Sequence, residues 1–430
     1  MQYITLLILA TYILFHIRKK NVISPDYIYT IVMLGSLYIT GLRLSAYQSK
    51  YEWWFYACIY GSVILFCTSY SITKKYKNNE KLKTQIRKSA AFVYDAGGVR
   101  KTIIFLWLIV EGAVLIMWSV LGAPPAISLT SERSSYYISG IGTLYLLNTA
   151  LFALIVFGYF QKNKCISKYS FLLFVGTTVL SVFLMANKFQ IFTLAIAFFT
   201  IISILKKEQS FRSILMLSVA AILLFAVMYE FVYSEMYSFS SADAVYWYKI
   251  SLPNQLTFLA QPYLYIANNF ENLYHFMSIE HHNTFGYNLM YNATRNMDLC
   301  KDFFGSQIVG FSNEFADSLQ MKSMNTGSAL IASYQDFGFL GIFVYSILIG
   351  AISGLAEKNL IKKRDFMSVF MYSYVIISLF LSFLSENFFS KPLLINLLAV
   401  WLLSPFINGR CRGVFRKFEG CGLKNNDQVH

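Results

Sequence analysis

Four basic residues of this chain lie apart from most of its positive charge. Arg43, Arg133, Lys188 and Arg295 fall in or beside connections where other basic residues are scarce. Brought together, guanidinium and ammonium groups would bind a phosphate or diphosphate, because they donate charge-assisted hydrogen bonds to its oxygens. Taken singly, each is equally explained as a side chain that reaches from an apolar segment to lipid headgroups.

Three of the five histidines are close together in the sequence, at His275, His281 and His282. Imidazole titrates near neutral pH and can take a proton from a hydroxyl group. Glu280 precedes the adjacent pair and could orient it. His281 and His282 are therefore candidate general bases, and the alternative is a pair of surface histidines without a catalytic role.

A polar stretch opens the longest apolar segment and contains Asn325, Tyr334 and Asp336. Residues 337–356 are free of charge and are long enough to cross a bilayer. We therefore expect Asp336 at the bilayer surface, as a candidate catalytic group. The alternative is a helix-start signal, in which Asn325 caps the helix and Asp336 pairs with a neighbouring arginine. The glycines of this segment suit close helix packing.

Composition decides which elements must position these residues. The chain has 430 residues, of which 56% are hydrophobic and only 13% charged, more apolar surface than a soluble domain of this size can bury. Its apolar runs are continuous rather than alternating, which favours helices over a barrel. We predict an all-α polytopic membrane protein with about 11 transmembrane helices. The candidate segments are 2–17, 26–45, 52–72, 102–121, 141–160, 169–186, 189–205, 213–233, 327–356, 365–384 and 392–408.

Basic residues are divided unequally between alternate connections, with 27 Lys and Arg in one set and 8 in the other. The richer set is cytoplasmic by the positive-inside rule. This places the N-terminus outside and the C-terminus in the cytoplasm. The net charge of +14 then reflects topology and contact with membrane lipids, and nucleic-acid binding is not needed to explain it.

The chain is predicted to form a single membrane domain over 1–430, with a basic cytoplasmic loop at 73–101 and a large outer loop at 234–325. The outer loop has 18 aromatic residues in 92, unlike a linker. Helical spacing from Pro262 onward predicts an amphipathic helix lying on or over the bilayer surface. No Cys/His spacing suggests a metal site, and we expect no cofactor.

The arrangement resembles the Wzy-type O-antigen (oligosaccharide repeat-unit) polymerases of bacterial inner membranes. The likeness rests on the stretch from Arg133 to Tyr136 and Tyr137, on the tight outer turn with Lys188, and on the polar stretch that follows the large outer loop. It implies a fold like that of GT-C glycosyltransferases, and a location in the inner (cytoplasmic) membrane.

The resemblance also implies a reaction. The donor is a growing glycan on undecaprenyl diphosphate, the acceptor is one lipid-linked repeat unit, and undecaprenyl diphosphate leaves without help from a metal. The four basic residues would bind the diphosphate, and Tyr136, Tyr137, Asn325 and Tyr334 would contact the glycan. A chain-length regulator protein is a possible partner. The alternatives are an O-antigen ligase, and a flippase or transporter of lipid-linked oligosaccharides.

Overall fold

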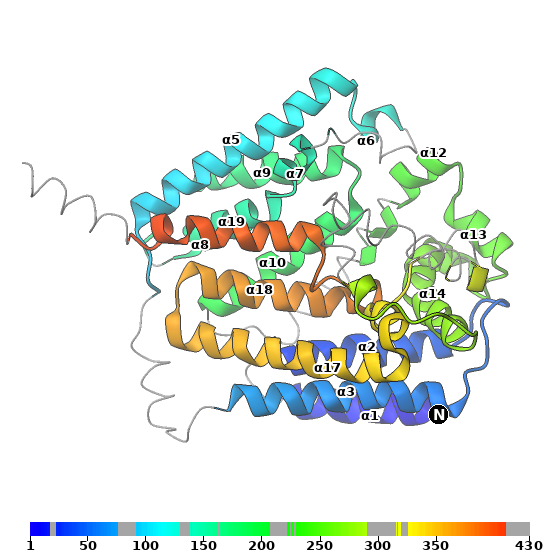
Figure 1. Cartoon of the computed structure of the whole chain (residues 1–430). Helices are drawn as coiled ribbons and strands as arrows, with labels where there is room; N and C mark the ends of the chain where they lie inside the picture. The colour runs from blue at the N-terminus through cyan, green and yellow to red at the C-terminus, as the bar shows by residue number, and fades with distance from the viewer. Residues whose placement is uncertain are drawn as a thin grey trace, which may run out of the picture.

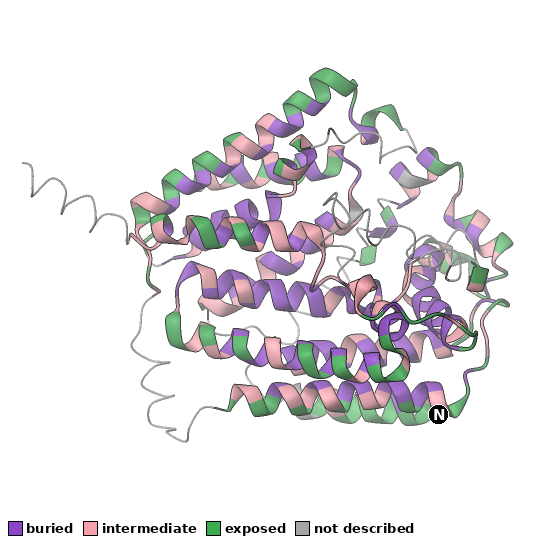
Figure 2. Cartoon of the chain, in the orientation of Figure 1, coloured by how far each residue is buried: buried purple, intermediate pink, exposed green. Residues whose placement is uncertain are grey.

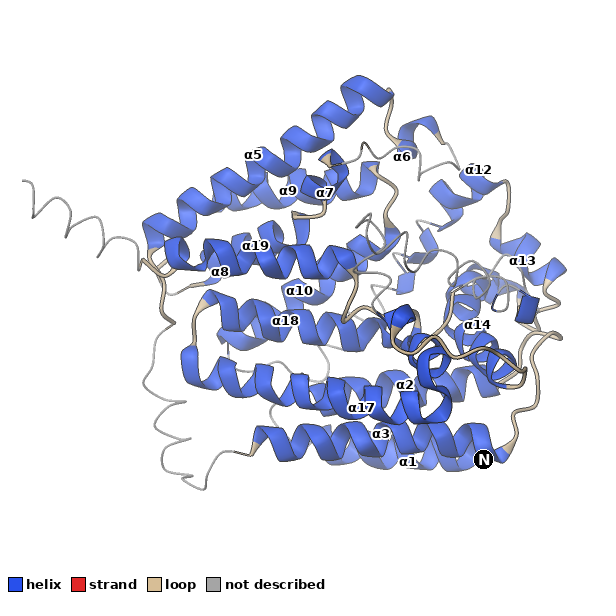
Figure 3. Cartoon of the chain, in the orientation of Figure 1, coloured by secondary structure: helices blue, strands red, loops and turns tan. Residues whose placement is uncertain are grey.

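The computed structural model describes residues 1–17, 23–75, 92–129, 138, 140–161, 163–206, 222–223, 225–227, 229–289, 315, 317–319 and 326–409, with the backbone alone at 15–17, 188 and 233. Within these ranges the chain is helical and has no strand, so the all-α prediction is confirmed (Figure 3). The main helices are α1 (Gln2–Ile17), α2 (Pro25–Gly41), α3 (Trp53–Lys74), α5 (Ala96–Leu121), α8 (Asn148–Phe160), α9 (Lys168–Leu184), α10 (Lys188–Lys206), α14 (Ala260–Met277), α17 (Ala329–Lys363), α18 (Phe366–Phe380) and α19 (Lys391–Ile407).

Among the described residues, six segments are helices long and apolar enough to cross a membrane: Trp53–Lys74, Ala96–Leu121, Ile141–Phe160, Phe189–Lys206, Ala329–Lys363 and Phe366–Phe383. Three shorter apolar helices, Gln2–Leu14, Lys168–Leu184 and Lys391–Ile407, coincide with further predicted segments, and α2 coincides with another. The segment predicted at 213–233 lies largely outside the described residues. Membrane-type helices are thus present, whereas the number 11 and the orientation remain predictions.

Outward-facing side chains agree with an apolar surrounding. Along α5, Phe105, Leu108 and Leu115 are more than half exposed, and Val344 is equally exposed on α17 (Figure 2). Such stripes of exposed apolar residues are unfavourable in water and ordinary in hydrocarbon.

The helices lie roughly side by side, and their connections gather at two opposite ends of the bundle (Figure 1). At one end, the 42–52 segment meets the large loop, because Ser251 N–H donates to Leu44 O at 2.7 Å and Ser45 pairs with Ile250. We call this the large-loop end. At the opposite end, Asp95 N–H donates to Ile407 O at 2.7 Å. We call this the basic end, because α3, α10 and α17 all finish there in lysines.

Helices α3 and α17 pack closely, and glycine makes this possible. A Cβ atom on Gly350 would lie 2.6 Å from the carbonyl oxygen of Phe66, and one on Gly354 would be almost as crowded. The predicted role of these glycines in helix packing is confirmed. At the basic end the same pair of helices is joined by an ion pair of 2.7 Å between Lys74 Nζ and Glu357 Oε1.

Helix α17 begins differently from the expectation. Ser328 caps it, since the Ser328 hydroxyl accepts from Leu330 N–H at 3.3 Å, and Asn325, the expected cap, lies outside the described residues. The helix is kinked at Phe337 and Gly338, and Gly338 has φ 60° and ψ −147°, a backbone conformation open essentially to glycine alone. The kink separates a short first segment from the uncharged stretch that follows.

Helix η2 (Tyr229–Tyr233) leads into the large loop. Within the loop, three short helices precede α14: α12 (Ser234–Tyr237), α13 (Ser241–Trp247) and η3 (Asn254–Leu259). The predicted helix near Pro262 is present as α14, and its position relative to the bilayer remains a prediction. It packs against α2, α13 and α17, and most of its residues are buried, polar ones included (Figure 2). Among its buried polar side chains, Glu271 and Asn272 bond to other segments.

Candidate functional site

Asp336 connects the kink of α17 to residues 284–289, which follow α14, through hydrogen bonds that we call the Asp336 clasp. Its carboxylate accepts from the Thr284 hydroxyl at 2.5 Å and from the backbone N–H groups of Asn288 and Leu289 at 2.9 and 3.0 Å. In the other direction, Phe285 N–H donates to the Asp336 carbonyl at 3.0 Å. The side chain therefore holds residues 284–289 in one position relative to α17.

Asp336 is fully buried within the protein, and its partners among the described residues are the loop groups above. Its predicted level at the bilayer surface remains a prediction. A carboxylate so occupied is suited to positioning neighbouring groups.

His281 lies against aromatic rings, three residues before the segment that the Asp336 clasp holds. Its ring centroid is 4.6 Å from that of Tyr334 and 5.2 Å from that of Phe276. Its Nε2 atom is buried and has no hydrogen-bond partner among the described residues. The structure thus brings together two residues singled out from the sequence, His281 and Tyr334, and a third, Asp336, binds the segment that begins three residues after His281. By contrast, His282 and Glu280 are exposed.

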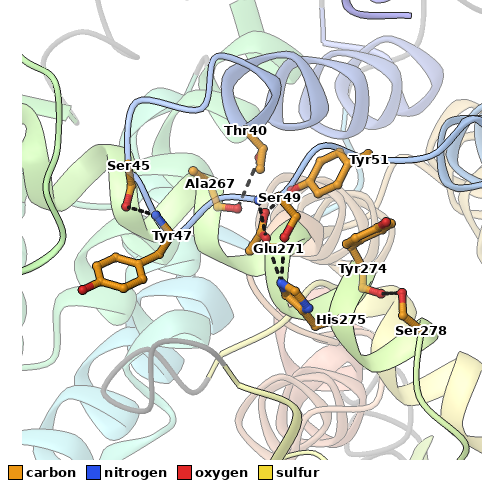
Figure 4. A network of polar contacts seen from close by, with 10 residues as sticks. All are labelled: Thr40, Ser45, Tyr47, Ser49, Tyr51, Ala267, Glu271, Tyr274, His275 and Ser278. Carbon is orange, nitrogen blue, oxygen red and sulfur yellow. Dashed lines mark hydrogen bonds and ion pairs between the residues drawn. The ribbon is translucent and has the colours of Figure 1, made fainter.

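A second polar cluster joins α14 to the 42–52 segment (Figure 4). Glu271 is buried, and its carboxylate accepts from Ser49 N–H at 2.8 Å, from the Tyr51 phenol at 2.9 Å and from His275 Nε2 at 2.9 Å. The Ser49 hydroxyl lies 3.0 Å from the same Nε2. Burial and then the Glu271 carboxylate raise the pKa of Tyr51 well above its ordinary value, which keeps its phenol a donor.

Ser49, His275 and Glu271 together do not form a hydrolytic triad. In a triad, the nucleophile and the orienting carboxylate bind different nitrogens of the imidazole. Here both oxygens approach Nε2, so this nitrogen cannot accept the serine proton while it donates to Glu271. The cluster anchors the 42–52 segment onto α14.

The sequence carried a partial signal for this cluster. Glu271 and His275 are four residues apart, so on a predicted helix they lie on one face. Nothing local points to Ser49 or Tyr51, because both meet α14 through contacts more than 200 residues apart in sequence.

The predicted diphosphate-binding residues are described only in part. Arg43 is exposed and has φ 48°, just after α2. Lys188 is the first residue of α10, and the ring of its neighbour Phe189 lies 6.4 Å from the ring of Tyr265 on α14. The tight turn predicted between α9 and α10 is confirmed, at 185–187. The remaining predicted ligands of diphosphate and glycan, Arg133, Arg295, Tyr136, Tyr137 and Asn325, lie outside the described residues.

Two further carboxyl groups, the half-buried Glu111 and the buried Glu386, have partners that the sequence did not indicate. Glu111 on α5 accepts from the Ser181 hydroxyl on α9. Glu386, in the connection from α18 to α19, accepts from Phe389 N–H at 3.1 Å and from the Tyr345 phenol at 3.3 Å. Burial raises the pKa of Glu386 to about 7. Across the described part of the chain, no group of three or more His, Cys, Asp or Glu residues is arranged to hold a metal ion.

Comparison of the chain with protein-family models, with curated proteins and with solved structures finds no match.

Proposed function

We propose that this protein is a membrane glycosyltransferase that polymerises oligosaccharide repeat units carried on undecaprenyl diphosphate, as the Wzy-type O-antigen polymerases do. In this proposal the basic end faces the cytoplasm of a bacterium, and the large-loop end faces outward from the inner membrane. The proposal combines the charge asymmetry of the connections with the residues gathered at the large-loop end.

The observation that carries the proposal is the buried, unpaired Nε2 atom of His281 beside Tyr334 and the Asp336 clasp. With its proton on Nδ1, this imidazole can accept a proton at Nε2. The acceptor hydroxyl oxygen would bond to the anomeric carbon of the donor as the bond to the diphosphate breaks. The hydroxyl proton would pass to His281 and then to water.

Charge develops on the departing diphosphate, and the basic residues would stabilise it there. Lys188, Arg133, Arg295 and Arg43 are assigned this role. Asp336 acts through the loop it holds and is a positioning residue. Tyr334, whose ring lies against His281, would present an aromatic face to a sugar.

The test is a reaction with purified protein in detergent, a synthetic undecaprenyl-diphosphate repeat unit and separation of products by length. The wild-type protein should give a ladder of lengths, which His281→Ala, Arg133→Ala and Arg295→Ala should abolish while the protein level is unchanged. The matched control is His282→Ala, because that neighbouring imidazole is exposed.

A normal ladder from His281→Ala would remove that residue from the reaction. No ladder from the wild-type protein, together with transfer of a single glycan to lipid A core, would indicate the ligase. Movement of the lipid across vesicles with no new glycosidic bond would indicate the flippase.

A further inference from the structure

One face of α14 is built largely from carboxamide side chains. Gln261, Asn268 and Asn272 lie seven and four residues apart, with Tyr265 between the first two, so all four share a stripe along the helix. The three carboxamides are each at most 2% exposed. This stripe is a separate feature from the Glu271 cluster and from the His281 surroundings.

Gln261 is the most unusual member. Among the described residues, neither its Oε1 nor its Nε2 atom, both buried, has a hydrogen-bond partner. The adjacent Asn269 donates through Nδ2 to Tyr265 O, yet its Oδ1 is also buried and has no partner among these residues. Burying several polar groups without partners is unfavourable, which favours a ligand that satisfies them.

The direction of this stripe is fixed by contacts of its other members. The Tyr265 ring lies 6.4 Å from that of Phe189 and 5.1 Å from that of Phe225. Asn272 Nδ2 donates to Thr326 O at 2.6 Å. Tyr265 therefore lies toward the start of α10, which begins at Lys188, the residue assigned to the diphosphate, and Asn272 lies toward the start of α17.

The chemistry of the stripe suits a particular ligand. A carboxamide offers an acceptor oxygen and two N–H donors, which matches hydroxyl and acetamido groups that both give and accept hydrogen bonds. Tyr265 and Phe225 add aromatic surface for the apolar face of a sugar ring. No described residue of the stripe carries a positive charge, and the Glu271 carboxylate is on the same helix, so a sugar carboxylate would have no countercharge here.

We propose that the carboxamide stripe of α14 binds an uncharged sugar ring, bearing hydroxyl or acetamido groups, at the position joined to the diphosphate. This subsite rests on the proposed function, and it adds a residue, Gln261, that selects the sugar rather than the lipid.

Binding to the full chain in nanodiscs tests the subsite with three probes: undecaprenyl diphosphate, the same lipid bearing N-acetylglucosamine, and the same lipid bearing glucuronic acid. The wild-type protein should bind the N-acetylglucosamine lipid at least fivefold more tightly than the bare lipid, and should show no such gain for glucuronic acid. Gln261→Leu should lose the gain while its affinity for the bare lipid changes less than twofold.

Gln161→Leu is the matched control, because Gln161 is also buried with an unpaired Nε2 but lies after α8 at the basic end. It should keep the full preference for the N-acetylglucosamine lipid. Since Gln261→Leu replaces an unpaired amide with an apolar group, we expect its melting temperature to be maintained or raised.

Equal binding of the bare and N-acetylglucosamine lipids by the wild-type protein, or an unchanged preference in Gln261→Leu, overturns the subsite. The ladder reaction separates this failure from failure of the proposed function. A wild-type protein that builds polymer while Gln261→Leu keeps its preference refutes the subsite alone. A wild-type protein that prefers the sugar-bearing lipid but joins no units refutes the polymerase alone.

Discussion

The hydroxyl oxygen of Ser49 lies 3.0 Å from Nε2 of His275, although 226 residues separate them in the chain. The contact exists because Glu271, one helical turn before His275, collects donors from the 42–52 segment. It therefore fixes how the 42–52 segment packs on α14 of the large loop.

Glu271→Ala should destabilise the protein strongly. The change leaves Ser49 N–H and the Tyr51 phenol buried without an acceptor, and we expect a loss of about 3 kcal/mol. Glu271→Gln should cost less, because the amide oxygen still accepts. Melting in detergent measures the difference, with the exposed Glu280→Ala as control. Equal melting temperatures for Glu271→Ala and Glu280→Ala would show that the cluster contributes nothing.

Asp336→Asn should loosen the segment 284–289. The Asn288 and Leu289 N–H groups donate to different oxygens of Asp336, and the amide keeps only one of them, so its NH2 group must face one of these two N–H donors at a cost of about 2 kcal/mol. Hydrogen exchange should show faster exchange at these two amides, and polymer formation should fall because His281 loses its support. The exposed Asp317→Asn serves as control. Unaltered exchange in Asp336→Asn would contradict the role of the clasp.

Gly338→Ala should destabilise the kink of α17 by about 1–3 kcal/mol. No atom lies within 4 Å of the added Cβ, so the whole effect comes from the backbone conformation, with φ 60° and ψ −147°. Gly112→Ala is the comparison. A Cβ atom added at Gly112 would also have no atom within 4 Å, but Gly112 lies inside the regular helix α5. There alanine should be neutral or stabilising by up to about 1 kcal/mol. Similar melting temperatures for the two variants would argue against a required glycine at the kink.

Glu386 should make stability depend on pH. Its pKa is about 7 in the folded protein and about 4.3 when unfolded, so the folded state binds more protons between these values. Stability should fall as pH rises from about 4 to 7 and then level off, by up to about 4 kcal/mol. Melting curves of Glu386→Gln should lack this component, whereas the exposed Glu235→Gln should retain it. Parallel pH profiles for wild type and Glu386→Gln would refute the assignment.

The sequence by itself determined the helices and the division of charge between the two ends of the bundle. Both properties are local: an apolar run of about 20 residues must satisfy its own backbone in lipid, and basic residues follow directly where such runs end. The helix near Pro262, the tight turn before Lys188 and the close packing at Gly350 followed from the same short-range rules.

The tertiary structure alone decided which polar groups meet. Asp336 is placed by donors that lie about 50 residues earlier in the chain, and Glu271 by donors more than 200 residues away. A hydrophobic pattern also cannot tell whether the polar face of a helix meets water or the protein, and only the structure shows that the polar side chains of α14 are largely buried in the protein. Hydrogen bonds and burial depend on which surfaces come into contact, and only the folded chain determines those contacts.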